Sequence, residues 1–337
     1  MKILYSVQAT GNGHISRAHQ LYPYLTELGH VDILLSGSNA TLPMDIPVKF
    51  RSKGLSLFYS ECGGLDYIKT LKACNFRRIM KEAQELPVKN YDLIINDFDH
   101  ITARACKLQS VPSVQFGHQA SFMSKNTPRP DSKNLIGEAI LKYYAQATNY
   151  VGLHFDRYDN FIFPPVIKDI FLQSKPIDNG HVTVYLPSYD KVCLEEIFKQ
   201  IAPIDIHWFI KGINEPYRDG NIHYFPVNQK YFNESLIHCH GLVTGGGFET
   251  PAEALYLGKK LLTIPIKGQY EQACNTAALK KMGVTAMTEL NHKTKDVFFT
   301  WLVSKNITPL IEANDINETL DYLMKQIDVK EPVLNEI

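Results

Sequence analysis

The sequence predicts an α/β protein built from two doubly wound domains that face each other across a cleft. Short apolar runs alternate with helical patterns in the first half of the chain, the alternation stops at a segment with two adjacent prolines, and it then starts again. Near-continuous apolar strands joined by helices are typical of parallel sheets covered on both faces. With 337 residues, the chain is long enough for two domains of roughly 150 residues each.

Five apolar runs predict the strands of the first domain. They are residues 2–7, 30–37, 91–98, 111–118 and 149–155. A helix is expected at 15–28 after the first strand, and Gly29 ends it. The apolar face of this helix consists of Ile15, Ala18, Tyr22, Leu25 and Leu28.

The proline-containing segment, FIFPPVIKD at 161–169, is predicted to be a linker because two prolines exclude a helix. After it, strands are expected at 181–187, 204–212, 241–246 and 259–266, and helices near 192–202, 230–238, 250–257 and 271–282. A last helical pattern covers 314–327, with Asp315 or Asn317 as its cap. We therefore predict domains at 1–162 and 163–313, and a final helical segment at 314–337 that crosses back to the first domain.

Composition excludes several classes of protein. Lysine plus arginine equals aspartate plus glutamate, 35 each, so there is no general attraction for nucleic acid. No apolar run approaches the length of a membrane-spanning helix, and the N-terminal apolar run is too short for a signal peptide. The six cysteines are scattered without a C-x-x-C pair, which argues against disulfides and structural zinc. These features predict a cytoplasmic protein.

The loop after the first strand, ATGNGHISR at 9–17, meets only part of the dinucleotide-binding pattern. Gly11 and Gly13 are present, but Ser16 stands where the third glycine belongs, and no acid ends the second strand. A nicotinamide cofactor is therefore not expected. The loop still places His14 at a helix N-terminus, where a neutral imidazole is favoured and can act as a base. The alternative is that His14 only covers the turn and Ser16 caps the helix.

A second glycine loop carries a stronger signal. Gly245, Gly246 and Gly247 leave a predicted strand and enter a helix, a geometry that suits a phosphate group. The polar segment GQYEQACN at 268–275 follows the next strand. Two adjacent strand ends thus predict a site for a diphosphate and for the hydroxyls of a sugar.

With these two loops the chain resembles the GT-B glycosyltransferases, which have two Rossmann-like domains, and especially the branch that uses UDP-sugars. That branch includes the lipid-II-forming N-acetylglucosaminyltransferase, monogalactosyldiacylglycerol synthase and the UDP-glycosyltransferases; the chain looks most like uncharacterised bacterial and archaeal members with a GQYEQ..N segment. The first loop matches the pattern GxGHxxR at Gly11, Gly13, His14 and Arg17. The second loop matches at Gly245, Gly246, Glu253, Ala254, Gly258, Pro265, Glu271, Gln272, Asn275, Leu279 and Gly283.

The resemblance implies a role for each matched position. The first domain would bind the acceptor and the second the nucleotide sugar, with no other cofactor. The residues implied in nucleotide-sugar binding are Gly11 and Gly13 in the first loop; Phe225 and Val227 beside the base; Gly245, Gly246 and Gly247 at the diphosphate; Thr250 at a phosphate; Glu253 at the ribose; and Glu271 and Gln272 at the sugar. His14 would lie near the reacting centre.

The chain departs from this pattern at several positions. UDP-glycosyltransferases usually have histidine in place of Gly245 and asparagine or serine near Glu249, so backbone N–H groups would bind the diphosphate and Glu249 is expected to point away. The Glu271–Gln272 pair also stands two residues further from Pro265 than usual, which leaves the donor sugar open. Thr250 and Glu253 also form a capping box, which favours a capping role for Thr250.

Polar residues at two strand ends of the first domain are candidates for proton transfer. Asp97 and Asp99 end one predicted strand and His118 the next. We rank His14 first as the base, then Asp97 or Asp99, then His118, with one of the two acids orienting His14. The alternatives are that both acids cap the helix near residue 100 and that His118 is a buried core group. Asp97-Phe-Asp99 has the spacing of a metal motif but lies in the wrong domain for the donor, so no metal is expected.

The leading functional hypothesis is an inverting, metal-independent transfer of a sugar from a UDP-sugar to a sugar, lipid-linked or small-molecule acceptor, with cell-envelope glycans as one setting. The alternatives are a UDP-sugar epimerase or hydrolase of the same fold, whose relatives lack the GxGHxxR loop, and a non-catalytic nucleotide-sugar-binding protein. The basic, apolar stretch at 69–89 is either a peripheral contact with the inner face of a membrane or simply a solvated face.

Overall fold

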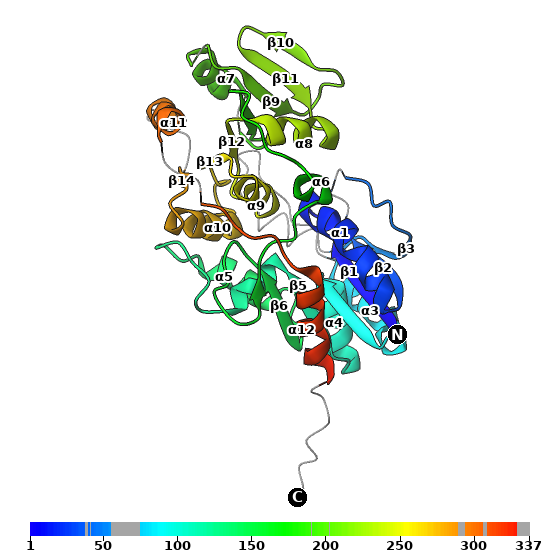
Figure 1. The fold of residues 1–337 in the computed structure, drawn as a ribbon. Helices are drawn as coiled ribbons and strands as arrows, with labels where there is room; N and C mark the ends of the chain where they lie inside the picture. The colour runs from blue at the N-terminus through cyan, green and yellow to red at the C-terminus, as the bar shows by residue number, and fades with distance from the viewer. Residues whose placement is uncertain are drawn as a thin grey trace, which may run out of the picture.

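The computed structural model describes residues 1–37, 40, 42–54, 75–189, 191–201, 203–288, 294–305 and 309–328. They form two α/β halves, one above the other in Figure 1, each with its own parallel sheet. The prediction of two doubly wound domains is confirmed.

The sheet of the first half has the strand order β3-β2-β1-β4-β5-β6-β7, and every pair in it is parallel. Its strands are β1 (Lys2–Gln8), β2 (His30–Ser36), β3 (Val48–Ser52), β4 (Leu93–Asp97), β5 (Val114–Gly117), β6 (Asn149–Leu153) and β7 (Ile162–Phe163). The short strand β7 lies inside the predicted linker, so Ile162 and Phe163 of that segment still belong to the sheet.

Helices connect these strands on both faces of the sheet. They are α1 (Asn12–Leu28), α3 (Phe76–Glu85), α4 (His100–Gln109) and α5 (Leu135–Tyr143), with two 3₁₀ helices at Val88–Asn90 and His118–Met123. The helix α1 starts three residues earlier than predicted and contains Pro23. Its apolar face, including Ile15, Ala18 and Leu21, is buried against the first sheet.

The sheet of the second half has the order β10-β11-β9-β8-β12-β13-β14 and is parallel except for the β10–β11 hairpin. Its strands are β8 (Val182–Tyr185), β9 (Ile206–Ile210), β10 (Tyr217–Asp219), β11 (Ile222–Pro226), β12 (Gly241–Thr244), β13 (Lys260–Thr263) and β14 (Thr285–Ala286). Its helices are α6 (Asp169–Leu172), α7 (Lys191–Lys199), α8 (Gln229–His238), α9 (Glu249–Tyr256), α10 (Tyr270–Lys281) and α11 (Thr294–Val303).

Each sheet has one point where the strand order reverses. It lies between β1 and β4 in the first half and between β8 and β12 in the second. Ligands of open α/β sheets bind at the carboxyl ends of the strands beside such a point. The His14 loop follows β1 and the three-glycine loop follows β12, so both loops occupy this position.

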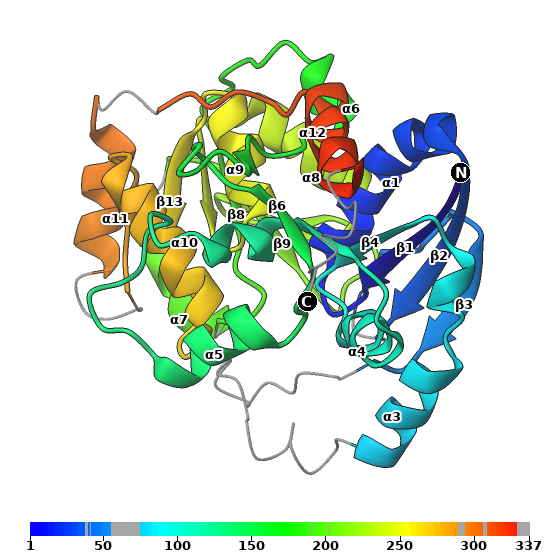
Figure 2. The same cartoon turned by 90° about the horizontal axis from the view of Figure 1, so that it is seen from below.

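The two halves meet along several elements. Figure 2 shows α5 of the first half beside α10 of the second, and the Tyr270 hydroxyl donates a hydrogen bond to Glu138 at 2.6 Å there. Gly137 allows this approach, because a Cβ on it would lie 2.5 Å from the Tyr270 side chain. The contact between α5 and α10 brings the carboxyl ends of the two sheets together.

The last helix, α12 (Ile316–Asp328), contacts α1 and β6 of the first half, and Figure 1 shows it alongside that half. Asp315 caps it by accepting hydrogen bonds from the backbone of Asn317 and Glu318. Leu320 and Leu323 on its inner face are buried. The chain therefore passes between the halves twice, once after β7 and once before α12.

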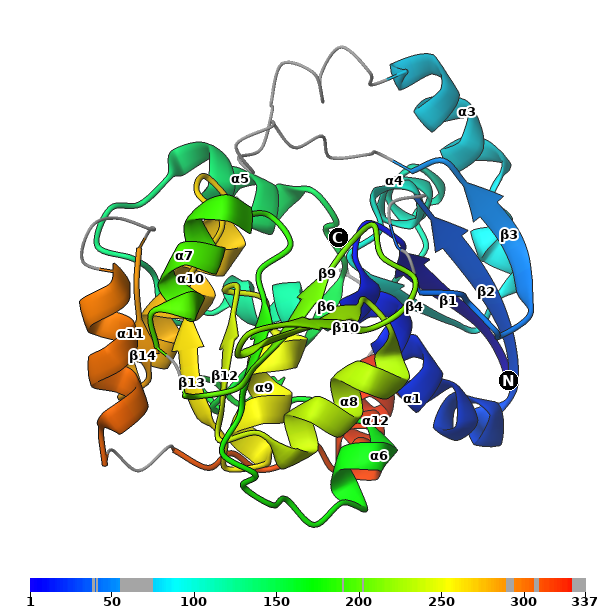
Figure 3. The same ribbon diagram turned by 90° about the horizontal axis from the view of Figure 1, so that it is seen from above.

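In the part of the chain that the structure describes, no helix is long and apolar enough to cross a membrane. The stretch 69–89 lies partly outside the described residues, since residues 55–74 are not among them. The described remainder includes α3, which Figure 3 shows at the outer side of the first half beside β3. Phe76 on α3 is 61% exposed, and Arg78 pairs with Glu82.

Candidate active site

A cavity of about 240 Å³ lies between the two halves at the carboxyl ends of their strands. Its first-half lining consists of Gln8, Thr10, Gly11, Gly13, His14, Arg17, Phe98, His118, Gln119, Gly137, Ile140 and Leu141. Its second-half lining consists of Gly247, Phe248, Glu249, Gln269, Tyr270 and Glu271. Among the predicted residues, both glycines of the first loop, His14, His118, Gly247 and Glu271 thus line one cavity.

His14 and Asp97 form a hydrogen-bonded pair at its wall. His14 Nδ1 lies 2.9 Å from Asp97 Oδ1, and the carboxylate is fully buried while 11% of the His14 side chain is exposed. Burial alone would raise the pKa of Asp97, but Arg17 and His14 outweigh it and hold this pKa below its ordinary value. In the tautomer with a proton on Nδ1, His14 donates this proton to the ionised Asp97, and Nε2 is then the basic nitrogen.

Asp99 has a different position, although it is only two residues away. Its Oδ2 accepts a hydrogen bond from the backbone N–H of Thr102 at 2.7 Å, so it caps α4. It is buried and is not part of the cavity lining. The structure thus brings Asp97, and not Asp99, to His14.

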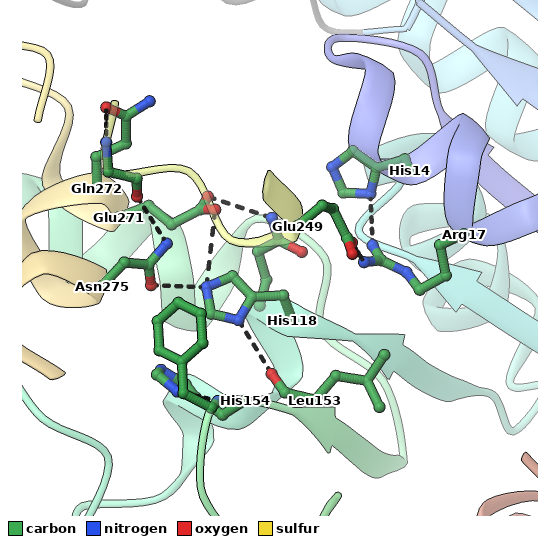
Figure 4. Close-up of polar contacts among 12 residues, drawn as sticks. His14, Arg17, His118, Leu153, His154, Glu249, Glu271, Gln272 and Asn275 are labelled. Carbon is green, nitrogen blue, oxygen red and sulfur yellow. Dashed lines mark hydrogen bonds and ion pairs between the residues drawn. The ribbon is translucent and has the colours of Figure 1, made fainter. Parts of the chain in front are cut away.

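Arg17 joins the two halves of the site, as Figure 4 shows. It is 3% exposed, and its guanidinium contacts Asp97 through Nε and Nη2 at 2.8–3.1 Å. Its Nη1 forms an ion pair with Glu249, the first residue of α9 in the second half. Glu249 thus turns its carboxylate across the cleft to Arg17. Burial, only partly offset by Arg17, raises the pKa of Glu249 to about 7.

His118 also lines the cavity, and both of its ring nitrogens have protein partners. Its Nδ1 lies 3.0 Å from the Leu153 carbonyl oxygen and its Nε2 2.8 Å from Asn275 Oδ1. The ring stacks on Phe248 with centroids 4.0 Å apart, and burial lowers its pKa despite the nearby Glu271. Its geometry is that of a buried packing group that links the two halves, which was the alternative to a base.

The three-glycine loop packs tightly on α10. Gln272 Oε1 accepts hydrogen bonds from the backbone N–H groups of Gly246 at 3.2 Å and Ile266 at 2.9 Å. A Cβ on Gly246 would lie 2.7 Å from the Gln272 carbonyl oxygen and 2.8 Å from Thr276 Oγ1, so only glycine fits there. Gln272 therefore holds the loop through its side chain.

A second cavity of about 130 Å³ opens on the other side of this loop. It is lined by Tyr185, Leu186, Pro187, Ser188, Tyr189, Thr244, Gly245, Gly247, Thr250, Pro251, Ile266 and Gln272. Gly247 lines both cavities, and a Cβ on it would have open space around it. A ligand that passes Gly247 would reach from one cavity into the other.

The predicted capping box is wrong. The helix α9 begins at Glu249, one residue before Thr250, and its N-terminus has no side-chain cap because Phe248 precedes it. Glu253 is 2% exposed and pairs with Lys168 of the linker at 2.8 Å, while its Oε2 has no hydrogen-bond partner. The carboxylate therefore binds a linker lysine instead of the helix start.

The remaining predicted residues lie on the second half. Glu271 accepts a hydrogen bond from Gln119 Nε2 at 3.2 Å across the cleft. Phe225 lies one residue before the end of β11 with its ring stacked on Phe209, and Val227, 39% exposed, follows the strand. Neither Phe225 nor Val227 lines the two cavities described above.

Sequence reasoning assigned no role to two residues that form ion pairs with predicted site residues. Arg17 belongs to the GxGHxxR pattern but received no role, and Lys168 lies in the linker. The one sequence signal for Arg17 was its spacing from His14, which puts both residues on one side of α1. Within the described ranges, no group of three or more His, Cys, Asp and Glu side chains could hold a metal ion.

The model of the family described as "Glycosyl transferase family 1" matches residues 1–304. The chain belongs to this family. It is therefore an enzyme that transfers sugars, a glycosyltransferase, and the resemblance drawn from the two glycine loops is confirmed. No curated protein sequence matches the chain significantly.

Solved structures with the same fold cover nearly the whole chain. MurG from Acinetobacter baumannii superposes with a TM-score of 0.59 at 12% identity, over 96% of this chain and 99% of that one. UGT89C1 from Arabidopsis thaliana, solved with UDP, gives 0.55 at 13% identity over 97% and 99%. LpCGTa, also solved with UDP, gives 0.62 at 14% identity over 98% and 99%. At these identities the likeness establishes the GT-B fold.

Proposed function

We propose that this glycosyltransferase moves a sugar from a UDP-sugar to an acceptor hydroxyl, with inversion at the sugar carbon and without a metal ion. The observation that carries the proposal is the His14–Asp97 pair at 2.9 Å, in which His14 lines the same cavity as Gly247 of the second glycine loop. The pair supplies a base on the first half, opposite a loop suited to a phosphate group on the second.

The donor would occupy the second half. The three-glycine loop leads into the N-terminus of α9, where free backbone N–H groups favour an anion. Two structures of the same fold were solved with UDP. We infer that the diphosphate lies along Gly245–Gly247, the nucleoside extends toward the smaller cavity and the sugar toward Glu271 and His14.

The chemistry follows from this arrangement. His14 Nε2 takes the proton of the acceptor hydroxyl while the acceptor oxygen attacks the first carbon of the sugar. The bond from that carbon to the diphosphate oxygen breaks, and UDP leaves with the electron pair. Asp97 stabilises the imidazolium that forms, and the N-terminus of α9 stabilises the charge on the leaving group. One displacement from the face opposite UDP inverts the configuration.

A panel of UDP-, GDP- and dTDP-sugars with sugar, lipid-linked and small-molecule acceptors tests the proposal. We expect transfer from a UDP-sugar in the presence of EDTA. His14→Ala should lower kcat about 100-fold or more, the usual contribution of a general base. Asp97→Asn should give a loss of the same order. A His14→Ala enzyme with wild-type rates, or dependence on an added metal, would contradict the mechanism.

We further propose that the stretch 69–89 contacts an anionic membrane at the cytoplasmic face. Its described part, α3, exposes Phe76 beside Arg77, and this pairing of an apolar with a basic side chain favours an anionic lipid surface. Flotation with anionic and with neutral vesicles tests it: we expect binding to the anionic vesicles alone, weakened by Phe76→Ser.

A further inference from the structure

The guanidinium of Arg17 is shared between carboxylates from the two halves of the molecule. Asp97 binds its Nε and Nη2 atoms from the first half, and Glu249 binds its Nη1 from the second. The same Nη2 lies 3.1 Å from His14 Nδ1. A single buried cation therefore connects the proposed base to the helix that follows the three-glycine loop (Figure 4).

The fold provides a fitted position for Glu249. A Cβ on Gly13 would lie 2.9 Å from Glu249 Cγ, so a side chain there would push Glu249 away from α1. On the opposite side, a Cβ on Gly117 would lie 2.7 Å from Asp97 Oδ1 and 3.3 Å from Arg17 Nη2. Glycines thus leave room for both carboxylates around the one guanidinium.

The number of charges changes during the reaction. Before proton transfer, Arg17 is the only cation and faces two carboxylates. When His14 takes the acceptor proton, two neighbouring cations face the same two carboxylates, and the cluster is balanced. Without Glu249, those two cations would share Asp97 alone, and unbalanced charge in a buried site is strongly unfavourable.

No other described ionisable group near the cluster can replace Glu249. Tyr5 on β1 is buried, and burial raises the pKa of its hydroxyl so that it stays neutral. Glu253 on α9 is paired with Lys168. Glu271 on α10 faces Gln119 and His118, and burial favours the neutral form of His118.

We propose that Glu249 is a positioning residue that couples closure of the cleft to the basicity of His14. With α9 against α1, the Glu249 carboxylate pairs with Arg17 and favours protonation of His14. When α9 moves away from α1, the negative charge of Glu249 moves with it, and His14 becomes a weaker base. The base is then strongest only when the donor half is in place, which protects the donor from water. The inference rests on the proposed function of His14.

The first test measures protonation of His14 directly, in the complete protein without substrate. Imidazole ¹⁵N shifts are followed against pH in the wild type, Glu249→Gln and Glu249→Asp, with the signal identified by its loss in His14→Gln. We expect the midpoint of His14 protonation to be lower in Glu249→Gln than in the wild type, by less than about one pH unit, because wild-type Glu249 has a pKa of about 7 and is itself partly protonated in that range. Glu249→Asp, which keeps the carboxylate, should restore part of the difference.

The second test measures transfer with saturating acceptor and varied UDP-sugar. At pH 8.5 we expect Glu249→Gln to lower kcat about tenfold without raising KM for the donor, because Glu249 follows the proposed diphosphate site and its negative charge does not attract an anion. The difference in kcat between Glu249→Gln and the wild type should be smaller at pH 6. The pKa of Glu249 is raised to about 7, so the wild-type carboxylate is mostly protonated at that pH. A packing defect would lower kcat equally at both pH values.

Glu318→Gln is the matched control. It removes an ion pair between α12 and Arg157 in which both side chains are about half exposed, away from the cavity, and should change neither measurement.

The two tests separate this inference from the proposed function. If the wild type transfers sugar and His14→Ala does not, while Glu249→Gln leaves the His14 midpoint and kcat unchanged, the coupling is wrong and the function stands. If the midpoint shifts but no sugar transfer is found, the coupling stands and the proposed function is wrong. An equal loss of kcat at pH 6 and pH 8.5 overturns the coupling.

Discussion

At the scale of single residues, Asp97 and Asp99 show how two neighbouring carboxylates take different roles. Both are buried at the end of β4. Asp97 is surrounded by Arg17 and His14, so its charge is matched by another side chain. Asp99 accepts a hydrogen bond from the backbone N–H of Thr102, and the backbone N–H of Asp99 donates one to the side-chain oxygen of Asn96. One acid thus binds two residues of the cavity lining, His14 and Arg17, and the other fixes the start of α4.

This difference gives the first prediction. Asp99→Ala should destabilise the protein by about 1 kcal/mol, the usual effect of losing a helix cap, while kcat stays within a few-fold of the wild type. Asp97→Asn should lower kcat by orders of magnitude because it removes the charge that balances the His14 imidazolium. Urea unfolding and initial rates on both variants check this. The reverse outcome, a stable but inactive Asp99→Ala, would mean that Asp99 acts in the chemistry.

The three-glycine loop gives a second prediction with its own control. Gly246→Ala should displace the loop from α10, since its Cβ would overlap a backbone oxygen; overpacking of this kind costs about 1–3 kcal/mol. Gly247→Ala adds a methyl group in open space and should unfold at the wild-type temperature. Thermal unfolding compares the two, and thermal shifts with UDP should be reduced in Gly246→Ala. Equal stability of the two variants would contradict the loop geometry.

The sequence could indicate which residue types form the site but not which atoms pair. Two strand ends at a reversal of strand order predict that His14 and the acids after β4 lie close together, and the structure has His14 beside Asp97. The pairing of Arg17 with Glu249 joins positions 232 residues apart and depends on how the halves close. Nothing in the local pattern of either segment specifies that contact.

At the scale of elements, the long buried strands and helices were predictable, and several exposed ones were not. The strand β10 has three exposed residues at a sheet edge, and β3 alternates between half-buried and exposed positions. Neither presents the near-continuous apolar run used to recognise a buried parallel strand. The helix α11 was also not predicted. The start of α9 differed from prediction because the glycine loop, and not a capping side chain, sets it.

Two stacked histidines at strands β8 and β9 are neutral in the folded protein, and protonation of either one would destabilise the fold. His181, directly before β8, stacks on His207 of β9 with centroids 3.8 Å apart, and Ser235 on α8 contacts both rings. Burial lowers the pKa of His181, and burial together with the neighbouring histidines His181 and His223 lowers that of His207 to about 3. An unfolded histidine titrates near pH 6.5. Below that pH the unfolded chain binds more protons than the folded one.

The third prediction follows from this difference in the number of bound protons. Stability contributed by the neutral pair is present above about pH 6.5 and is lost as the pH falls toward 3. Between pH 7.5 and pH 4.5, His207→Gln should lose less free energy of unfolding than the wild type, by about 1–2 kcal/mol for this half-buried ring. Urea unfolding at both pH values measures this. His30→Gln, whose ring is 69% exposed, should behave like the wild type; equal losses in all three proteins would contradict the prediction.

At the scale of the whole molecule, the two passages between the halves are joined to each other. The Asn314 backbone N–H donates to the Pro165 carbonyl oxygen at 2.9 Å, and its side-chain Nδ2 donates to Pro164 at 2.8 Å. The linker also carries Lys168, which binds Glu253 on α9. Movement of the second half would therefore act on both passages at once, and any closing motion must preserve or break these contacts together.

One cluster of buried apolar residues also extends through both halves. It includes Leu21 of α1, Leu323 of α12, and Leu236 and Leu255 from α8 and α9. The helix α12 therefore does more than cover the first sheet, because its apolar side is continuous with the core of the second half. Loss of packing at α12 should therefore destabilise the second half as well as the first half, which α12 contacts most.

Leu323→Ala tests this continuity. Leu323 is fully buried, and removing such a side chain costs about 2–5 kcal/mol. Both tryptophans, Trp208 and Trp301, lie in the second half, so their fluorescence reports that half alone while circular dichroism reports both. We expect the two urea transitions to stay coincident and to shift together to lower urea, with exposed Asp321→Ala as the unshifted control. A fluorescence transition that stays in place while circular dichroism shifts would mean that the two halves unfold independently and that α12 stabilises only the first.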